Sequence, residues 1–533
     1  MKSTKKLLSI SNLKKYFPVA KTSLFQKEQL YVRANEDITL DIYEGETIGV
    51  VGESGCGKST LGRVLLQLYP QTAGTTMYYG STLADAAPSY VEETLKNLGK
   101  YKSALQKAAD KSAELDKKVA EIGEDNADFY LLQEQNLAHC EEQTCRNNIV
   151  KILGGFFAAD EAKGVDLLHR EYEANVRRRK ANEKYIVARL DYEQGLEENK
   201  GDDKLASLKR ELDAAEKELE GCKAACDKIV AQLDALRASH AGEPEFDKYE
   251  AMRDDGIDLS RLKYNEMRVF RKDLQIIFQD PYSSLNPRMT ISQIIEEGLL
   301  THNFYKHGSD KMRQHIVRTM EECGLQEYML HRYPHQFSGG QRQRVAIARA
   351  LAVQPKFIVC DECVSALDVS IQSQIINLLQ ELRERQNLTY MFISHDLSVV
   401  RYISDRICVM YLGNVVELGE SETIFNDPRH PYTVALLSSI PTTDPESLKK
   451  QRILLEGNIP SPIRPPTGCK FHTRCYMACD KCKTVPPELQ EVEPGHFLAC
   501  HFPERKLDAD GNYLFEMPKM MKVSRTIEEI PAE

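Results

Sequence analysis

A glycine-rich loop near the start of the chain carries the residue types best suited to chemistry. It has the pattern G-x-x-x-x-G-K-[ST] and consists of Gly52, Glu53, Ser54, Gly55, Cys56, Gly57, Lys58 and Ser59, followed by Thr60. In such a loop, glycines leave backbone N–H groups free to surround phosphate oxygens. Lys58 would reach the terminal phosphates, and the Ser59 hydroxyl would bind Mg²⁺. The loop therefore predicts a nucleotide-phosphate site.

Two adjacent carboxylates form a second chemical group. Asp361 and Glu362 follow the apolar residues 357–360, so we expect them at the end of a buried strand. Asp361 is predicted to hold Mg²⁺ through water and Glu362 to polarise the attacking water. Phosphoryl transfer needs little covalent chemistry from a protein, so position and charge decide the rate. The alternative is a carboxylate pair that only caps a strand.

A third motif, at residues 337–341, has no role within one ordinary nucleotide site. Together with the loop and the carboxylates it resembles the ABC ATPases, which implies that Ser338, Gly339, Gly340 and Gln341 cap the ATP held by a partner subunit. The resemblance implies an α/β fold, namely an ABC-type P-loop ATPase with a RecA-like core and antiparallel β and helical subdomains. It also implies an enzyme, an ATPase with ATP and Mg²⁺ as ligands.

Three more residues match motifs of these ATPases. Gln279 corresponds to a glutamine that touches the metal and the attacking water, and His395 to a histidine that contacts the γ-phosphate. Tyr16 is the candidate for stacking on adenine, with Phe17 as its competitor. The chain departs from the family at Cys363, where proline is usual. This change removes no group that touches nucleotide, so we expect a hydrolytically competent site.

A narrower resemblance is to the F-type ATP-binding subunit of oligopeptide/dipeptide importers. It is carried by residues 52–63, 275–290, 333–350, 430–437 and 462–469. It implies a second ATP-binding subunit, of D-type in a heterodimer although a homodimer remains open. It also implies two transmembrane permease subunits and an extracytoplasmic peptide-binding protein. The chain would then sit peripherally on the cytoplasmic face of the membrane and would hold no peptide pocket.

Short strands must position the phosphate loop. Residues 38–42 alternate between polar and apolar, as in a half-buried strand, and residues 46–51 form the strand that delivers the loop. We expect a helix to begin at Lys58, so that its N-terminus points at the phosphates.

The stretch 81–253 has a different composition, rich in Lys, Glu, Ala and Leu. Its apolar positions alternate in steps of three and four, which indicates a coiled-coil seam. The seam residues are Leu205, Leu208, Leu212, Ala215, Leu219, Cys222, Cys226, Ile229, Leu233 and Leu236. A weaker seam runs through residues 98–122. We predict that these two segments pair as one antiparallel helical hairpin, with further helices from residues 120–170 at its far end.

These patterns divide the chain into five parts. The ATPase domain comprises 1–80 and 254–430, interrupted by the helical insertion 81–253, and a C-terminal extension 431–505 precedes a tail 506–533. A net charge of −10 argues against an extended nucleic-acid-binding face. The sequence has no apolar run of ~20 residues and no secretory signal, so a cytoplasmic location is expected.

Cysteines cluster in the C-terminal extension. Cys469, Cys475, Cys482 and Cys500 supply four thiolates, as a [4Fe–4S] cluster or a Zn²⁺ site requires. The importer family is associated with such a cluster, which favours iron–sulfur. Zn²⁺ with nearby histidines and unligated thiols remain alternatives, and Cys479 could replace Cys482.

A coiled-coil ABC ATPase of DNA repair or chromosome maintenance is the rival interpretation. In those proteins the long arm follows the glutamine motif. Here the arm precedes Gln279, and residues 279–341 stay in one continuous stretch. We therefore favour the importer subunit and expect no nucleic-acid partner. The basic run 176–180 is interpreted as a solvated helix face.

Overall fold

An eight-stranded sheet carries the phosphate loop, which follows β3. The computed structural model describes residues 5–21, 30–123, 129–439, 453, 455 and 457–502. The strand order is β11-β12-β10-β9-β3-β8-β7-β6. The strands are β3 (Thr47–Val51), β6 (Leu274–Ile277), β7 (Phe357–Asp361), β8 (Thr389–Ile393), β9 (Arg406–Tyr411), β10 (Asn414–Glu420), β11 (Gln490–Glu493) and β12 (His496–Leu498).

The centre of this sheet is parallel and its C-terminal edge is antiparallel. Strands β6, β7, β8, β3 and β9 run parallel, whereas β10, β12 and β11 pair antiparallel. Every residue of β3, β7 and β8 is buried, as expected for parallel strands covered on both faces. The C-terminal extension therefore adds two strands to the main sheet.

A second, antiparallel sheet has the order β2-β1-β4-β5. Its strands are β1 (Lys6–Pro18), β2 (Tyr31–Tyr43), β4 (Ala73–Tyr78) and β5 (Ile257–Asp258). Ile38, Leu40 and Ile42 of β2 are buried in alternation, as predicted from the sequence. They join a core with Leu61, Val64 and Met410, which binds this sheet to the main one.

Helices complete the ATPase part of the chain. α1 (Lys58–Leu65) follows the phosphate loop, and α11, α12 and α13 pack against one another. The helices after the insertion are α9 (Tyr264–Phe270), α10 (Pro281–Ser284), α11 (Ile291–Thr301), α12 (Asp310–Glu322), α13 (Gly339–Ala352), α14 (Val369–Gln386), α15 (Leu397–Ile403) and α16 (Ser421–Asn426). The C-terminal extension contains α17 (Pro431–Ser438) and α18 (Asp480–Thr484). This arrangement is the α/β fold with antiparallel β and helical subdomains expected from the sequence.

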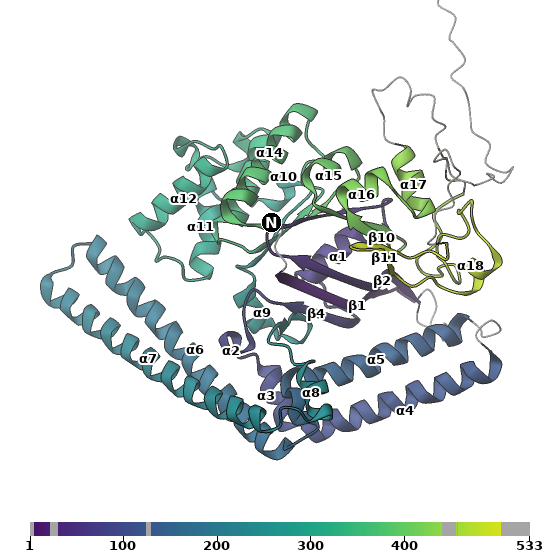
Figure 1. Ribbon diagram of the computed structural model, residues 1–533. Coiled ribbons are helices and arrows are strands. Elements are labelled where there is room, and N and C mark those ends of the chain that lie inside the picture. Colours follow the sequence, from purple (N-terminus) through teal and green to yellow (C-terminus); the bar gives the residue numbers. More distant parts are fainter. Residues whose placement is uncertain are drawn as a thin grey trace, which may run out of the picture.

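The insertion forms two helical hairpins that leave a common base and diverge (Figure 1). In one hairpin α4 packs on α5, and in the other α6 packs on α7. The helices of the insertion are α2 (Leu83–Ala86), α3 (Ser89–Lys96), α4 (Leu98–Ile122), α5 (Phe129–Leu153), α6 (Glu161–Glu197), α7 (Asp202–Ser239) and α8 (Pro244–Glu250).

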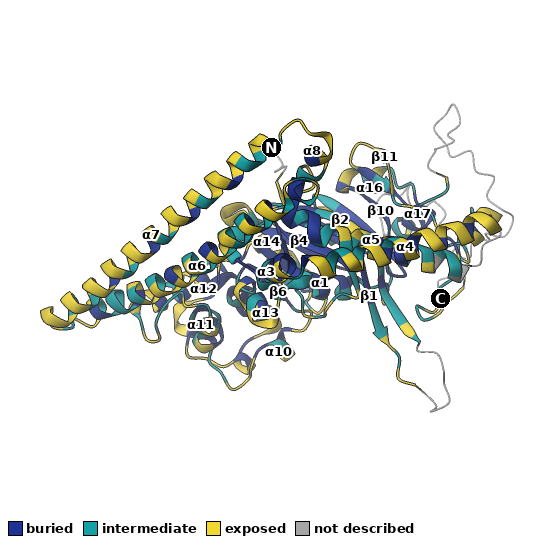
Figure 2. Cartoon of the chain, turned by 90° about the horizontal axis from the view of Figure 1, so that it is seen from below, coloured by how far each residue is buried: buried dark blue, intermediate teal, exposed yellow. Residues whose placement is uncertain are grey.

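The prediction that residues 98–122 and 205–236 pair in one hairpin is wrong. The seam itself is real, because the buried residues of α7 include Leu212, Leu219, Cys226 and Leu233 at intervals of seven. A heptad seam shows that a helix needs a partner but does not identify it. The 37-residue α6 precedes α7 by a short turn, and this local pairing costs little loop entropy. Figure 2 shows the exposed outer face of α7.

The insertion occupies the connection of a β-hairpin. Tyr78 of β4 pairs directly with Ile257 of β5, so the chain leaves and returns at neighbouring positions. The base of the insertion has its own core, which includes Leu95, Phe156 and Phe246. The insertion therefore projects from the antiparallel sheet without interrupting either sheet.

The α6–α7 hairpin also touches the helical subdomain. Glu197 at the end of α6 accepts hydrogen bonds from Ser309 Oγ (3.4 Å) and the Asp310 N–H (3.1 Å), at the start of α12. Lys306 lies 3.0 Å from Asp191, and Lys311 lies 3.0 Å from Glu193. These pairs are largely exposed, so each contributes about 0–1 kcal/mol.

Three further predictions concern the basic run, membrane-spanning segments and the C-terminal tail. In the basic run 176–180, Arg178 pairs with Asp85 (3.0 Å) and Arg179 donates to the Ala86 carbonyl (2.8 Å), so part of the run contacts α2. None of the helices in the described ranges has both the length and the apolar character of a membrane span. The predicted tail 506–533 lies outside the described residues.

Candidate nucleotide-binding site

The phosphate loop lies between β3 and α1, and two of its glycines have no room for a side chain. Gly52 (φ 147°) would place a Cβ 2.2 Å from the Met410 carbonyl oxygen. Gly57 (φ 103°) would place one 2.1 Å from the Ala34 carbonyl oxygen. Helix α1 begins at Lys58, as predicted, so its first N–H groups adjoin the loop. Close backbone packing therefore fixes the loop on both sides.

Lys58 is held by the loop itself. Its side chain is buried, and Nζ donates to the carbonyls of Gly52 (2.8 Å) and Glu53 (3.1 Å). The ammonium group is thereby fixed beside the backbone that would surround phosphates.

Ser59 and Asp361, which the sequence predicts as Mg²⁺ ligands, lie side by side. Ser59 Oγ donates to Asp361 Oδ1 over 2.6 Å, and Arg63 lies 3.4 Å from Asp361 Oδ2. Asp361 ends β7 and is buried. A hydroxyl and a carboxylate side by side are the hard oxygen ligands that Mg²⁺ prefers, so these residues fit that ion.

Glu362 contacts the side chains of the other two predicted catalytic residues. Gln279 Nε2 donates to Glu362 Oε2 (2.7 Å), and His395 Nδ1 lies 3.6 Å from Glu362 Oε1. Glu362 has a φ of 49°, a left-handed conformation that is unusual for a residue with a side chain. Its N–H donates to the Ile393 carbonyl on β8, which holds this turn in place.

Cys363, the departure from the family pattern, is buried in the core beside Cys360. A reduced cysteine there packs as a small hydrophobic residue. The substitution leaves the contacts of Glu362 with Gln279 and His395 intact.

The two candidate adenine-stacking residues have different surroundings. Tyr16 donates its hydroxyl to Glu36 Oε1 (2.8 Å), and the Arg33 guanidinium lies 5.8 Å from its ring centre. Phe17 instead packs edge-on against Tyr69, with ring centres 5.5 Å apart. Tyr16 is thus tied to a charged network at the edge of the site.

The residues 338–341 lie on the helical subdomain, at the start of α13. Ser338 caps this helix: its Oγ accepts from the Gln341 N–H (3.3 Å), and Gln341 Oε1 accepts from the Ser338 N–H (3.1 Å). Ser338 and Gly339 are exposed. Within the described part of the chain, no hydrogen bond or ion pair joins residues 338–341 to residues 52–60.

The structure adds contacts that sequence reasoning missed. Arg474 pairs with Glu53 of the phosphate loop, Tyr432 Oη accepts a hydrogen bond from the Glu53 N–H (2.8 Å), and Lys470 pairs with Glu36. All three side chains come from the C-terminal extension. The only signal in the sequence was their position in or near the segments 430–437 and 462–469 that resemble importer subunits.

The four predicted cysteine ligands gather in the extension. Burial raises the pKa of Cys475 to about 12, and the neighbouring Cys469, Cys500 and Cys482 add to this shift. Cys479 Sγ lies 3.6 Å from Cys482 Sγ. Nevertheless, among the described residues no three Cys, His, Asp or Glu side chains are arranged to hold a metal ion. The sulfur atoms are thus near one another but not in a ligand geometry.

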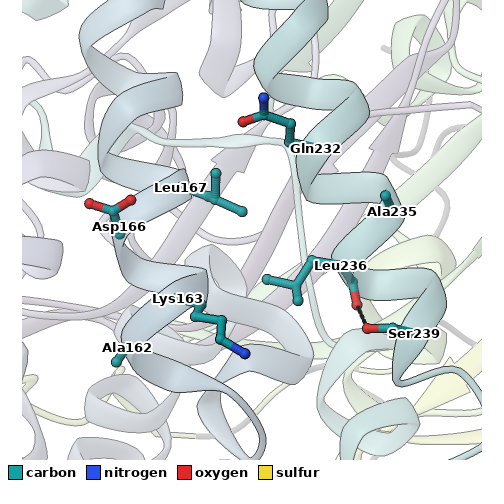
Figure 3. Close-up of a pocket in the computed structure, with 8 residues that line it drawn as sticks. All are labelled: Ala162, Lys163, Asp166, Leu167, Gln232, Ala235, Leu236 and Ser239. Atoms are coloured by element: carbon teal, nitrogen blue, oxygen red, sulfur yellow. Dashed lines mark hydrogen bonds between the residues drawn. The ribbon is translucent and has the colours of Figure 1, made fainter.

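A shallow groove lies between α6 and α7, in the helical insertion (Figure 3). Leu167, Ala235 and Leu236 are among its apolar lining residues, and Lys163 and Asp166 also line it. It contains none of the predicted site residues.

Two family models match the chain. The model described as "ABC transporter" matches residues 35–161 and 243–365, and the one described as "Oligopeptide/dipeptide transporter, C-terminal region" matches residues 416–482. The interval between the two ABC segments contains nearly all of α6 and α7.

Curated relatives are similar over somewhat less than half of this chain. The putative oligopeptide transport ATP-binding protein YkfD of Bacillus subtilis is 54% identical over 248 residues, which are 46% of this chain and 75% of that protein. The oligopeptide transport ATP-binding protein AppF of the same organism is 53% identical over 250 residues, with the same coverage. OppF of Escherichia coli, which has the same description, is 52% identical over 246 residues, 46% of this chain and 73% of that protein.

Proposed function

The chain belongs to the ABC transporter family of oligopeptide transport ATP-binding proteins, and we propose that it is the subunit that binds and hydrolyses ATP to drive a peptide importer. One observation carries the proposal. Ser59, Gln279 and His395, from three distant segments, meet at the adjacent carboxylates Asp361 and Glu362.

The proposed chemical roles are supported by these contacts and by the resemblance to ABC ATPases. Lys58 and the N–H groups of the phosphate loop bind the phosphates, and Tyr16 stacks on adenine. Glu362 accepts a proton from the attacking water, while Gln279 and His395 orient that water and the γ-phosphate. Positioning and charge then supply most of the rate acceleration.

Ser59, Asp361 and Gln279 are proposed to hold Mg²⁺. When bound, the ion would neutralise the charge that develops on the phosphate oxygens. The short Ser59–Asp361 hydrogen bond supports this assignment, because both oxygen atoms already face each other.

The proposed assembly contains two ATP-binding subunits beneath two transmembrane permease subunits. The second ATP-binding subunit is proposed to be of D-type, and a peptide-binding protein outside the cell delivers the peptide. The exposed Ser338 and Gly339 support an arrangement in which residues 338–341 cap the ATP of the other subunit. The chain is then peripheral on the cytoplasmic face of the membrane.

We also propose that Cys469, Cys475, Cys482 and Cys500 bind a [4Fe–4S] cluster, with Zn²⁺ as the alternative. The proposal is supported by the partial burial of these thiols and by their mutual proximity. The sulfur atoms must shift to become ligands. Anaerobic purification with iron, sulfide and zinc analysis, on wild type and Cys475→Ser, tests it: absence of all metals would reject both forms.

The insertion does not favour the DNA-repair alternative. It connects the paired strands β4 and β5 and therefore precedes Gln279 in the sequence. It also consists of two hairpins rather than one long arm.

Replacement of the proposed catalytic carboxylate tests the function. Glu362→Gln should bind Mg·ATP but hydrolyse it at least about 100-fold more slowly, because the base is lost while the binding groups remain. Glu384→Gln, an exposed glutamate on α14, is the matched control and should behave as wild type. Unchanged hydrolysis in Glu362→Gln would contradict the proposed function.

A further inference from the structure

The C-terminal extension reaches the nucleotide site through one short segment. Residues 470–474 lie between Cys469 and Cys475. Two of their side chains, Lys470 and Arg474, form ion pairs with carboxylates of the candidate site, 434 and 421 positions away in the sequence.

Arg474 forms an ion pair with Glu53 of the phosphate loop. Its two terminal nitrogens donate to both Glu53 carboxylate oxygens, at 2.7 and 3.0 Å. The Arg474 side chain is only 6% exposed. This two-bond geometry is the strongest and most directional that arginine forms with a carboxylate.

Glu53 in turn holds the lysine of the loop. Its carbonyl accepts a hydrogen bond from Lys58 Nζ, and its N–H donates to the Tyr432 hydroxyl. Arg474 therefore fixes the residue whose backbone places the phosphate-binding ammonium group.

Lys470 acts at the other edge of the site. Its Nζ donates to Glu36 Oε2 (2.7 Å) and to the Leu412 carbonyl (3.2 Å), and Glu36 also accepts the Tyr16 hydroxyl. Burial acts to raise the pKa of Glu36, but Lys470 and Arg33 bring it down to about 2. Glu36 thus remains charged and keeps Tyr16 in place.

Phe471, between these two cations, anchors the segment. Its ring is 1% exposed and packs against Tyr411 (5.1 Å between ring centres) and Tyr432 (5.4 Å). Tyr432 is the residue that holds the Glu53 N–H. The segment therefore cannot shift without disturbing the support of the phosphate loop.

We propose that Arg474 and Lys470 are positioning residues of the nucleotide site, so that the C-terminal extension sets the affinity for ATP. Arg474 neutralises a carboxylate that would otherwise repel the triphosphate, and it fixes the loop that carries Lys58. Lys470 fixes Glu36 and, through it, Tyr16. The inference rests on the proposed ATP site.

Titration calorimetry of the full chain with the non-hydrolysable analogue AMP-PNP and Mg²⁺ tests the proposal. Arg474→Met should weaken binding about ten-fold or more, because a charged, two-bond contact is lost and Glu53 is left unpaired. Arg474→Lys should weaken it less, since lysine keeps the charge but not the two parallel bonds. Adding Glu53→Gln to Arg474→Met should recover part of the loss, because the repelling charge is gone.

The matched control is Arg429→Met. Arg429 is a second, mostly buried arginine beside the extension, and it pairs with Asp427 and Glu493 rather than with the loop. Its replacement should change affinity by less than about two-fold. If Arg474→Met does not fold, Arg474→Lys carries the same test with a smaller effect.

Three results would overturn the inference: equal binding by wild type and Arg474→Met, no recovery in the double variant, or an equal loss in Arg429→Met. Failure of the wild-type chain itself to bind AMP-PNP would instead reject the proposed ATP site, and the inference with it.

Discussion

At the scale of single residues, the site depends on backbone positions that tolerate no side chain. Gly57 combines a φ of 103° with a carbonyl oxygen 2.1 Å from the place of a Cβ. Gly55 has a φ of 82° but no atom within 4 Å of that place. Substitutions at these two glycines therefore distinguish the effect of backbone strain, present at both, from that of a steric clash, present only at Gly57.

We predict that Gly57→Ala abolishes tight nucleotide binding, whereas Gly55→Ala weakens it only modestly. Alanine at either position costs roughly 1 kcal/mol for the left-handed backbone. At Gly57, alanine must also displace the Ala34 carbonyl, which moves the start of α1. Calorimetry with AMP-PNP measures both variants, and equal affinities would show that the clash is relieved without moving the loop.

His430 links the stability of the extension to pH. Its ring is fully buried, and Nδ1 accepts the Tyr432 N–H (3.1 Å) at the start of α17. Burial lowers the pKa of His430 to about 4, despite the opposing charge of Glu417. In the unfolded chain a histidine has a pKa of about 6.5.

Stability should therefore fall as pH decreases from about 6.5 to about 4, because in this window the unfolded chain binds a proton that the folded chain does not. One such group contributes up to about 1.4 kcal/mol per pH unit. The urea midpoint should drop more between pH 7 and pH 5 in wild type than in His430→Asn, which keeps a helix-capping side chain. Parallel pH profiles for the two proteins would argue against this role.

At the scale of elements, the insertion is attached at a place where its removal disturbs the rest of the fold least. Tyr78 and Ile257 are paired neighbours, so a short turn can replace residues 81–253. We predict that this deletion variant folds and binds AMP-PNP with an affinity within about three-fold of wild type. Its melting temperature should fall, because Tyr90 Oη no longer accepts from the Asp258 N–H and Arg261 loses Thr94. Loss of nucleotide binding would show that the insertion supports the ATPase fold itself.

How much of the fold the sequence predicts depends on how local the signal is. The strand at residues 46–51, the start of α1 at Lys58 and the seam of α7 follow from short-range patterns, and each is present. The partner of α7 did not follow, because the amphipathic pattern of α6 is too weak to indicate from the sequence that it packs on α7. The predicted domain boundaries remain predictions.

The candidate site likewise contains residues that sequence motifs predict and residues that they do not. Ser59, Gln279, Asp361, Glu362 and His395 were predicted from motifs, and the structure brings them together. Arg474 and Lys470 were not predicted, since a single arginine or lysine beside a cysteine carries no pattern that indicates a carboxylate hundreds of residues away. Only the tertiary fold could reveal these contacts.

At the scale of the whole molecule, the proposed function requires residues 338–341 to act on the nucleotide of a partner subunit. Ser338 is exposed at the start of α13, and its N–H and Oγ form hydrogen bonds with Gln341 of the same chain. If residues 338–341 act on the ATP of a partner, binding and hydrolysis should respond differently to their replacement. Lys58, which contacts the phosphate loop of its own chain, provides the contrast.

We predict that Ser338→Arg binds AMP-PNP within about two-fold of wild type, while its ATP hydrolysis in the assembled pair of subunits falls at least about 100-fold. The arginine blocks the surface that must close over the partner's nucleotide but leaves the phosphate loop of its own chain untouched. Lys58→Ala should instead lose binding itself. For wild type, hydrolysis per molecule should rise with the concentration of the partner subunit, because the complete site forms only on association. A rate per molecule that does not depend on partner concentration, together with active Ser338→Arg, would mean that one chain contains the whole catalytic site.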